Sequence, residues 1–265
     1  MPCSCSVIIN AMEELAPARL TQNWDNTGLL LGDSGQHVSK VLVALDITPE
    51  VVEEAVTRST ELIITHHPVI FQPLRNIRKD KPVGQMLFKL IQNNISVYSA
   101  HTNLDMARGG VNDTLASILK LENVQILQPL ESENTYGFAR IGKLSETTEL
   151  AVFAETLKSL LGSKHVRMVG DAKKKINSVV VSSGSYNSIT NIAREKCADV
   201  IVTGDLKYHD ARDILDCGLS AVDAGHFSTE NIIVPVIIKH IFSKLNNMDI
   251  KVIKSEKSQD IFTVI

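Results

Sequence analysis

Short apolar runs alternate with helix-length segments along the first part of the chain. Three of these runs are rich in β-branched residues and short enough to be buried strands: 40–45, 62–65 and 95–100. Between them, Pro49 opens one helix-like segment, with Thr48 placed to cap it, and a second such segment lies around 83–93. This order of elements predicts a mostly parallel sheet with right-handed crossovers.

The same order returns in the second part of the chain. Its strand-like and helix-like runs are 179–182, 186–196, 200–203, 209–216, 219–222 and an apolar helix that reaches about 245. We interpret the repeat as an internal duplication, so the predicted fold is α/β with two similar halves. The alternative is a chance similarity between ordinary strand–helix units. A polar stretch near 128–135 separates the expected N-terminal half, 1–128, from the C-terminal half, 129–265.

Histidine and carboxylate residues recur directly after four of the predicted strands. The segments are THH at 65–67, SAHTNLD at 99–105, TGDLKYH at 203–209 and GHFSTE at 225–230. Ligands of parallel α/β sheets collect beyond the carboxyl ends of the strands. The sequence therefore predicts a site at these strand ends, between the two halves.

The adjacent histidines His66 and His67 suggest that this site holds two metal ions. Neighbouring side chains diverge at the end of a strand, so each imidazole would serve a different ion of a close pair. A carboxylate can bridge two such ions, which suits Asp105 or Glu230. The predicted metal ligands are His66, His67, Asp105, His226 and Glu230. Imidazole and carboxylate together favour Zn²⁺, Fe²⁺, Mn²⁺, Co²⁺ or Ni²⁺ over Ca²⁺ or Mg²⁺.

Each of these motifs has a simpler explanation when it is taken alone. His66 and His67 could merely close a strand end, and Asp105 could be an ordinary turn residue. His226 and Glu230 lie four positions apart and could simply hydrogen-bond at a helix start. Their recurrence at neighbouring strand ends is what favours the metal interpretation.

Two further segments allow a functional and a structural interpretation. The segment 23–33, NWDNTGLLLGD, could line the entrance of the site, but we favour a turn in which Trp24 packs as an anchor. The segment 137–144, GFARIGKL, could present Arg140 to an anionic ligand, and a strand with a bulge explains it equally well.

Composition narrows the class of partner. The 265 residues carry a formal net charge of −3, which gives no electrostatic case for nucleic acid or an anionic membrane as the main partner. No apolar run approaches the length of about 18 residues that a membrane span needs. The first residues lack the basic segment of a signal peptide, so the expected location is the cytoplasm.

The strand-end motifs, together with NWDNTGLLLGD, resemble the Nif-three-like dinuclear metal-binding family. Its members are often labelled type-two homologues of GTP cyclohydrolase I, and the resemblance covers nearly the whole chain. It implies the same five metal ligands, with Glu230 as the bridging group. It also implies a toroidal homohexamer whose sites face an internal cavity.

Three functions are consistent with such a centre. The first is a metal-dependent hydrolase that acts on an anionic phosphoester or nucleotide-like molecule through a metal-bridging hydroxide. His101 and His209, which are not needed as ligands, would then transfer protons or contact the substrate. The second is a non-catalytic protein that stores, delivers or senses metal, or that scaffolds partners. The third, opening of the guanine ring of GTP, needs a base-recognition pocket for which the sequence shows no signal.

Overall fold

The computed structural model describes residues 3–130 and 135–264, and the chain divides into two compact units. Unit 1 contains residues 1–107 and 233–259, and unit 2 contains residues 108–232 and 260–265. This division differs from the single boundary expected near 128–135. The reason is that the chain returns to unit 1 after 232, where its last strand joins the sheet of that unit.

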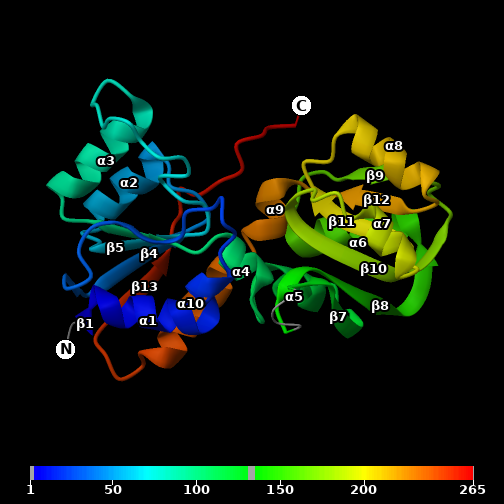
Figure 1. Cartoon of the computed structure of the whole chain (residues 1–265), viewed down its shortest axis with the longest axis horizontal. Coiled ribbons are helices and arrows are strands. Elements are labelled where there is room, and N and C mark those ends of the chain that lie inside the picture. The colour runs from blue at the N-terminus through cyan, green and yellow to red at the C-terminus, as the bar shows by residue number, and fades with distance from the viewer. Residues whose placement is uncertain (1–2, 131–134, 265) are drawn as a thin grey trace. The chain divides into compact units, whose positions relative to one another are not determined.

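The sheet of unit 1 has five strands, most of them parallel (Figure 1). In spatial order they are β13 (Lys251–Lys254), β4 (Lys40–Ala44), β5 (Leu62–Thr65), β6 (Ser96–Ser99) and β2 (Gly28–Leu31). Strands β13, β4, β5 and β6 are parallel, and β2 pairs with β6 in the antiparallel sense. The carboxyl ends of β5 and β6 therefore lie side by side at one edge of the sheet.

Helices cover both faces of this sheet, as Figure 1 shows. Helices α2 (Pro49–Thr57) and α3 (Pro82–Gln92) lie on one face, and α1 (Cys5–Leu15) and α10 (Ile233–Lys244) on the other. The predicted cap of α2 is confirmed, because the Thr48 side chain accepts a hydrogen bond from the backbone of Val51 at 3.3 Å. The shorter elements of unit 1 are β1 (Cys3–Ser4), β3 (His37–Val38), η1 (Ala18–Leu20) and α4 (Thr102–Met106).

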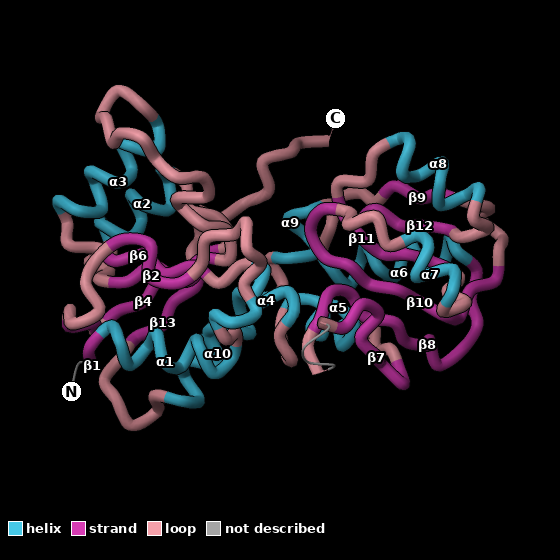
Figure 2. The backbone as a smooth tube through the Cα atoms, in the orientation of Figure 1, coloured by secondary structure: helices cyan, strands magenta, loops and turns pink. Residues whose placement is uncertain are grey.

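Unit 2 is built on a mixed six-stranded sheet (Figure 2). In spatial order its strands are β7 (Glu122–Pro129), β8 (Gly137–Glu149), β10 (Lys175–Ser185), β11 (Val200–Gly204), β12 (Ser220–Asp223) and β9 (Arg167–Val169). Strands β10, β11 and β12 are parallel, and β7, β8 and β9 are antiparallel to their neighbours.

Two hydrophobic clusters hold helices on the two faces of this second sheet. One cluster contains residues of α5 (Val111–Ile118) and α6 (Leu150–Leu161), and the other contains residues of α7 (Thr190–Glu195) and α8 (Tyr208–Asp216). Val179 and Val181 of β10 face the first cluster and Val180 faces the second, as the alternation of a strand requires. The short helix α9 (His226–Glu230) follows β12.

The predicted α/β class is confirmed, and the two units share a pattern. Each unit has three consecutive parallel strands joined by helices, with an antiparallel strand beside the third. Strand β8 contains the segment 137–144, for which a strand with a bulge was one of the two interpretations, whereas the last strand β13 was not anticipated. None of the helices in the described part of the chain combines the length and the hydropathy that crossing a membrane requires.

Candidate metal centre

His66 and His67 directly follow β5, and the backbone fixes both. Their amide groups donate to the same carbonyl oxygen, that of Leu45, at 3.2 and 3.0 Å. The side chain of His66 is fully buried, and its Nδ1 lies 2.8 Å from the carbonyl oxygen of Ala100. Because a carbonyl can only accept, Nδ1 carries the proton, and the lone pair of the neutral ring lies on Nε2.

His67 and His101 have the same arrangement, with a carboxylate in place of the carbonyl. His67 Nδ1 lies 2.6 Å from an oxygen of Asp46, and His101 Nδ1 lies 2.8 Å from an oxygen of Asp25. One ring nitrogen of each of His66, His67 and His101 lies within 4.8 Å of the others. Three imidazoles at the ends of β5 and β6 thus converge with the spacing of a metal site.

Asp105 adds a carboxylate to this group. It lies on α4, the short helix that follows His101, and its amide donates to the carbonyl of His101 at 3.1 Å. Its Oδ1 lies 3.6 Å from Nε2 of His66. Both atoms are acceptors when the histidine is neutral, so a shared cation would satisfy them better than a direct contact would.

Asp25 is the residue of this group that the sequence interpretation undervalued. Its side chain is fully buried and accepts hydrogen bonds from His101 and from both the amide and the hydroxyl of Thr102, the latter at 3.1 and 2.6 Å. Burial alone would raise the pKa of Asp25, but the hydrogen bonds from His101 and Thr102 lower it to about 2. Asp25 is therefore an anion that fixes the ring of His101.

The turn interpretation of the segment 23–33 describes only part of this role, and Trp24 is 58% exposed instead of packing as an anchor. The turn itself exists, because the amide of Asp25 donates to the carbonyl of Gln22 at 2.9 Å. The contact from Asp25 to His101 spans 76 positions, however, and no local pattern announces it. In the sequence, the available signal was only an acidic residue beside the single tryptophan.

In unit 2, His226 and Glu230 lie on the same face of α9. His226 Nε2 lies 2.9 Å from Oε2 of Glu230, so the contact expected between side chains four positions apart is present. His226 Nδ1 lies 2.7 Å from an oxygen of Asp205 and 3.4 Å from the hydroxyl of Ser185. Burial would raise the pKa of Asp205, but the hydrogen bonds from His226 and Ser185 lower it.

Gly184 makes room for this pair. A Cβ at position 184 would lie 1.9 Å from Oε1 of Glu230, and the backbone there has a φ of +65°. Both the space and the left-handed conformation therefore require glycine. The amide of Gly184 also donates to Oγ1 of Thr229 at 3.0 Å, which ties α9 to β10.

The predicted site residues thus divide between the units. Unit 1 brings together His66, His67, His101 and Asp105, and unit 2 brings together His226 and Glu230. His209 is exposed on α8, where its ring contacts that of Tyr208, and it belongs to no group with metal-ligand spacing among the described residues. Its assignment to proton transfer or substrate contact therefore gains no support from its position.

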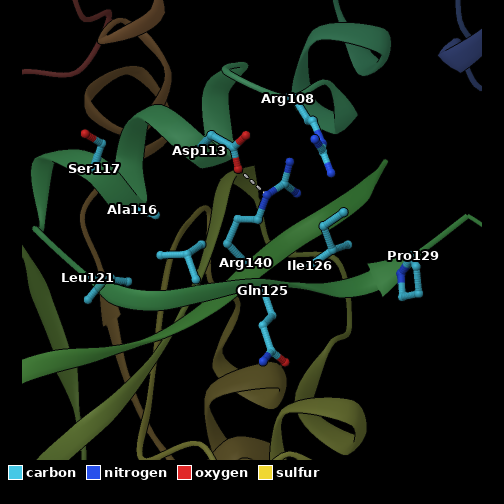
Figure 3. Close-up of a pocket in the computed structure, with 10 residues that line it drawn as sticks. Arg108, Asp113, Ala116, Ser117, Leu121, Gln125, Ile126, Pro129 and Arg140 are labelled. Atoms are coloured by element: carbon cyan, nitrogen blue, oxygen red, sulfur yellow. Dashed lines mark hydrogen bonds and ion pairs between the residues drawn. The ribbon is translucent and has the colours of Figure 1, made fainter. Parts of the chain in front are cut away.

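Arg140 lines a separate cavity of about 760 Å³ in unit 2, between α5 and the β7–β8 hairpin (Figure 3). Its guanidinium is buried, is paired with Asp113, and donates to the carbonyls of Gly137 and Ala139 at 2.7 and 3.0 Å. Ala139 has a φ of +56°, so the strand is irregular at this point. These contacts favour a structural role for Arg140 in holding the hairpin against α5.

Comparisons with known proteins agree over nearly the whole chain. The family model described as Duf34/NIF3 (NGG1p interacting factor 3) matches residues 3–261. The GTP cyclohydrolase 1 type 2 homolog of Clostridium perfringens is 36% identical over 258 residues, which cover 97% of this chain and 98% of that protein.

Solved structures give the same result. The structure of the Bacillus cereus protein related to NIF3 is 28% identical, with a TM-score of 0.95 and full coverage of both chains. Reduced HcgD from Methanocaldococcus jannaschii is 31% identical, with a TM-score of 0.81, and the match covers 97% of this chain and 99% of that one.

Proposed function

Because this chain belongs to the Duf34/NIF3 family, we propose that it is a metal-dependent hydrolase of a small anionic molecule, a phosphoester or nucleotide-like compound. The proposed ligands of its two divalent cations are His66, His67, Asp105, His226 and Glu230. Glu230 is the proposed bridging group. Zn²⁺, Fe²⁺, Mn²⁺, Co²⁺ and Ni²⁺ all suit this set of donors.

One observation carries the proposal: four histidines have their Nδ1 atoms held by acceptors. The acceptors are the carbonyl of Ala100 and the carboxylates of Asp46, Asp25 and Asp205. An acceptor behind Nδ1 fixes the tautomer, orients the ring and makes Nε2 a better donor to a metal, and this is the usual arrangement around metal-binding histidines.

The charge of the proposed centre favours an anionic substrate. Two divalent cations would outweigh the carboxylates of Asp105 and Glu230, whereas those of Asp25, Asp46 and Asp205 lie behind the imidazoles and would only reduce this preference. When bound, the cations would activate water and stabilise the negative charge that develops during hydrolysis.

His101 is the proposed proton carrier. Asp25 holds its Nδ1–H, so Nε2 is the atom that can accept a proton from an attacking group or return it to a leaving group. The same geometry would let His101 bind metal, because its ring nitrogen lies within 4.8 Å of those of His66 and His67. The His101→Gln variant separates these roles: unchanged metal content with lost turnover supports proton transfer, and lost metal makes His101 a ligand.

The proposal is tested by elemental analysis of protein purified without chelator, followed by assays on phosphodiesters, cyclic nucleotides and GTP. We expect about two metal ions per chain and turnover that requires them. Glu230→Ala should abolish both, and His37→Ala, at an exposed position of β3, should change neither. Turnover that survives Glu230→Ala would refute the scheme.

The same experiment separates the alternatives. Stoichiometric metal with no turnover on any compound would instead support storage, delivery or scaffolding. Ring opening of GTP alone would support the third hypothesis. The proposed homohexamer is tested by the molar mass of the metal-loaded protein in solution.

A further inference from the structure

Two aromatic side chains stand exposed beside His101 in unit 1. Trp24 is 58% exposed and Phe71 is 43% exposed. Their ring centroids lie 6.1 Å apart, with the planes inclined at 68°. Each ring also meets the ring of His101 edge to face, at centroid distances of 6.3 Å for Trp24 and 6.1 Å for Phe71.

The backbone on both sides of this pair is held by hydrogen bonds. Asp25, the residue after Trp24, is anchored on His101 and Thr102. The side-chain amide of Asn26 donates to the carbonyl of Ile70, the residue before Phe71, at 2.5 Å. The two rings are therefore positioned by their neighbours in the chain, while their own surfaces remain open to solvent.

Exposed apolar side chains are ordinary when they stand alone on a protein surface. Phe242, which is 68% exposed on α10, is an example in the same unit. Trp24 and Phe71 differ because they contact each other, contact the same histidine and lie on two loops that are tied together. Open rings that are fixed in this way are preorganised to bind a flat ligand.

We propose that Trp24 and Phe71 bind the heteroaromatic ring of the substrate and place its anionic group at the metal centre. This inference rests on the proposed function and narrows its substrate class to ring-bearing anions. Stacking on an aromatic side chain selects planar rings and tolerates different bases, because every base has a π-face. A substrate ring bound against Trp24 and Phe71 would lie next to His101, and the charged group of the substrate would lie near His66 and His67.

The single tryptophan of the chain makes the inference directly measurable. We would load the protein with Zn²⁺, which has no redox chemistry, and follow Trp24 emission during titration with three probes. AMP carries a ring and a phosphate, adenosine carries only the ring, and ribose phosphate carries only the phosphate. Saturable quenching should be strong with AMP, weaker with adenosine and absent with ribose phosphate.

Two substitutions test directly whether the rings of Phe71 and Trp24 bind the ligand. Phe71→Leu should weaken AMP binding about tenfold or more, because it removes a stacking surface. Phe242→Leu is the matched control, since it makes the same change at an exposed site of the same unit and should leave AMP binding unchanged. Trp24→Phe loses the optical signal, so its weaker binding would be measured by calorimetry.

Zinc content is measured in every variant, so that the two proposals fail separately. A wild-type chain that takes up no zinc would refute the metal centre and the inference that rests on it. If AMP does not change the Trp24 emission of the zinc-loaded protein, ring binding by Trp24 and Phe71 is refuted, but the metal centre is not. Equal AMP affinity of Phe71→Leu and Phe242→Leu would also refute ring binding by Trp24 and Phe71.

Discussion

Corresponding strands of unit 1 and unit 2 are followed by different polar residues. After β5, unit 1 has His66 and His67, and at the corresponding end of β11 unit 2 has Gly204 and Asp205. Asp205 holds the ring of His226, as Asp46 holds that of His67. The position that supplies a proposed ligand in one unit therefore supplies the partner of a proposed ligand in the other.

In both units, each histidine of the candidate site has a hydrogen-bond acceptor at Nδ1, but these acceptors differ in their exposure to water. His66 relies on the carbonyl of the fully buried Ala100 and His67 on a carboxylate that is 38% exposed, whereas the carboxylate behind His226 is 47% exposed. An enclosed acceptor holds an imidazole more firmly, because water does not compete for it. We therefore expect unit 1 to be the more rigid contributor to metal binding, and the following changes test that comparison.

The largest effect should follow from His66→Asn. The asparagine amide can still donate toward the carbonyl of Ala100, but the Nε2 atom is lost. Metal affinity should fall by more than about 100-fold, because a ligand is worth more than the partners that orient it. Metal titration monitored by calorimetry gives the affinity, and an unchanged value would exclude His66 as a ligand.

Gly184→Ala should cause the next largest loss of metal affinity, because it acts on His226 and Glu230 in unit 2. The new methyl group would meet Oε1 of Glu230 and displace it, lowering metal affinity by about 10-fold to 100-fold. Gly218→Ala is the control, since Gly218 has a φ of +77° and nothing within 4 Å of the added atom. It should cost about 1 kcal/mol of unfolding free energy through backbone strain alone and leave metal binding intact.

Lowering the pH should show how much the buried carboxylate of Asp25 contributes to the stability of the metal-free protein. Folding holds the pKa of Asp25 at about 2, below its ordinary value of 3.8. The carboxylate therefore contributes stability above about pH 4 that is lost as the pH falls toward 2. This contribution is at most about 2.5 kcal/mol. Urea unfolding at a series of acid pH values should show the loss in the wild type, and Asp25→Asn should lack that component.

The smallest effect should follow from Asp205→Asn in unit 2. Because the Asp205 carboxylate is half exposed, water can replace part of its hydrogen bond to His226, and metal affinity should fall by less than about tenfold. Asp46→Asn, which acts on His67 of unit 1 through a carboxylate that is 38% exposed, should lower it more. A larger loss from Asp205→Asn than from Asp46→Asn would reverse the comparison between the two units.

The sequence by itself determined the local part of this protein. Apolar runs of strand length gave β4, β5 and β6 and the matching strands β10, β11 and β12, because burial on both faces demands continuous apolar residues. The residues at the strand ends followed from the same runs. The proposed ligands could therefore be named before any coordinate was known.

The tertiary structure decided everything that depends on distant segments. Helix α10 and strand β13 return to unit 1 from the end of the chain, and no local pattern states which sheet a strand will join. The acceptors behind His67, His101 and His226 lie 21, 76 and 21 positions away from them. Such contacts arise only when the folded sheet brings loops together, because a hydrogen bond depends on distance in space and leaves no spacing in the sequence.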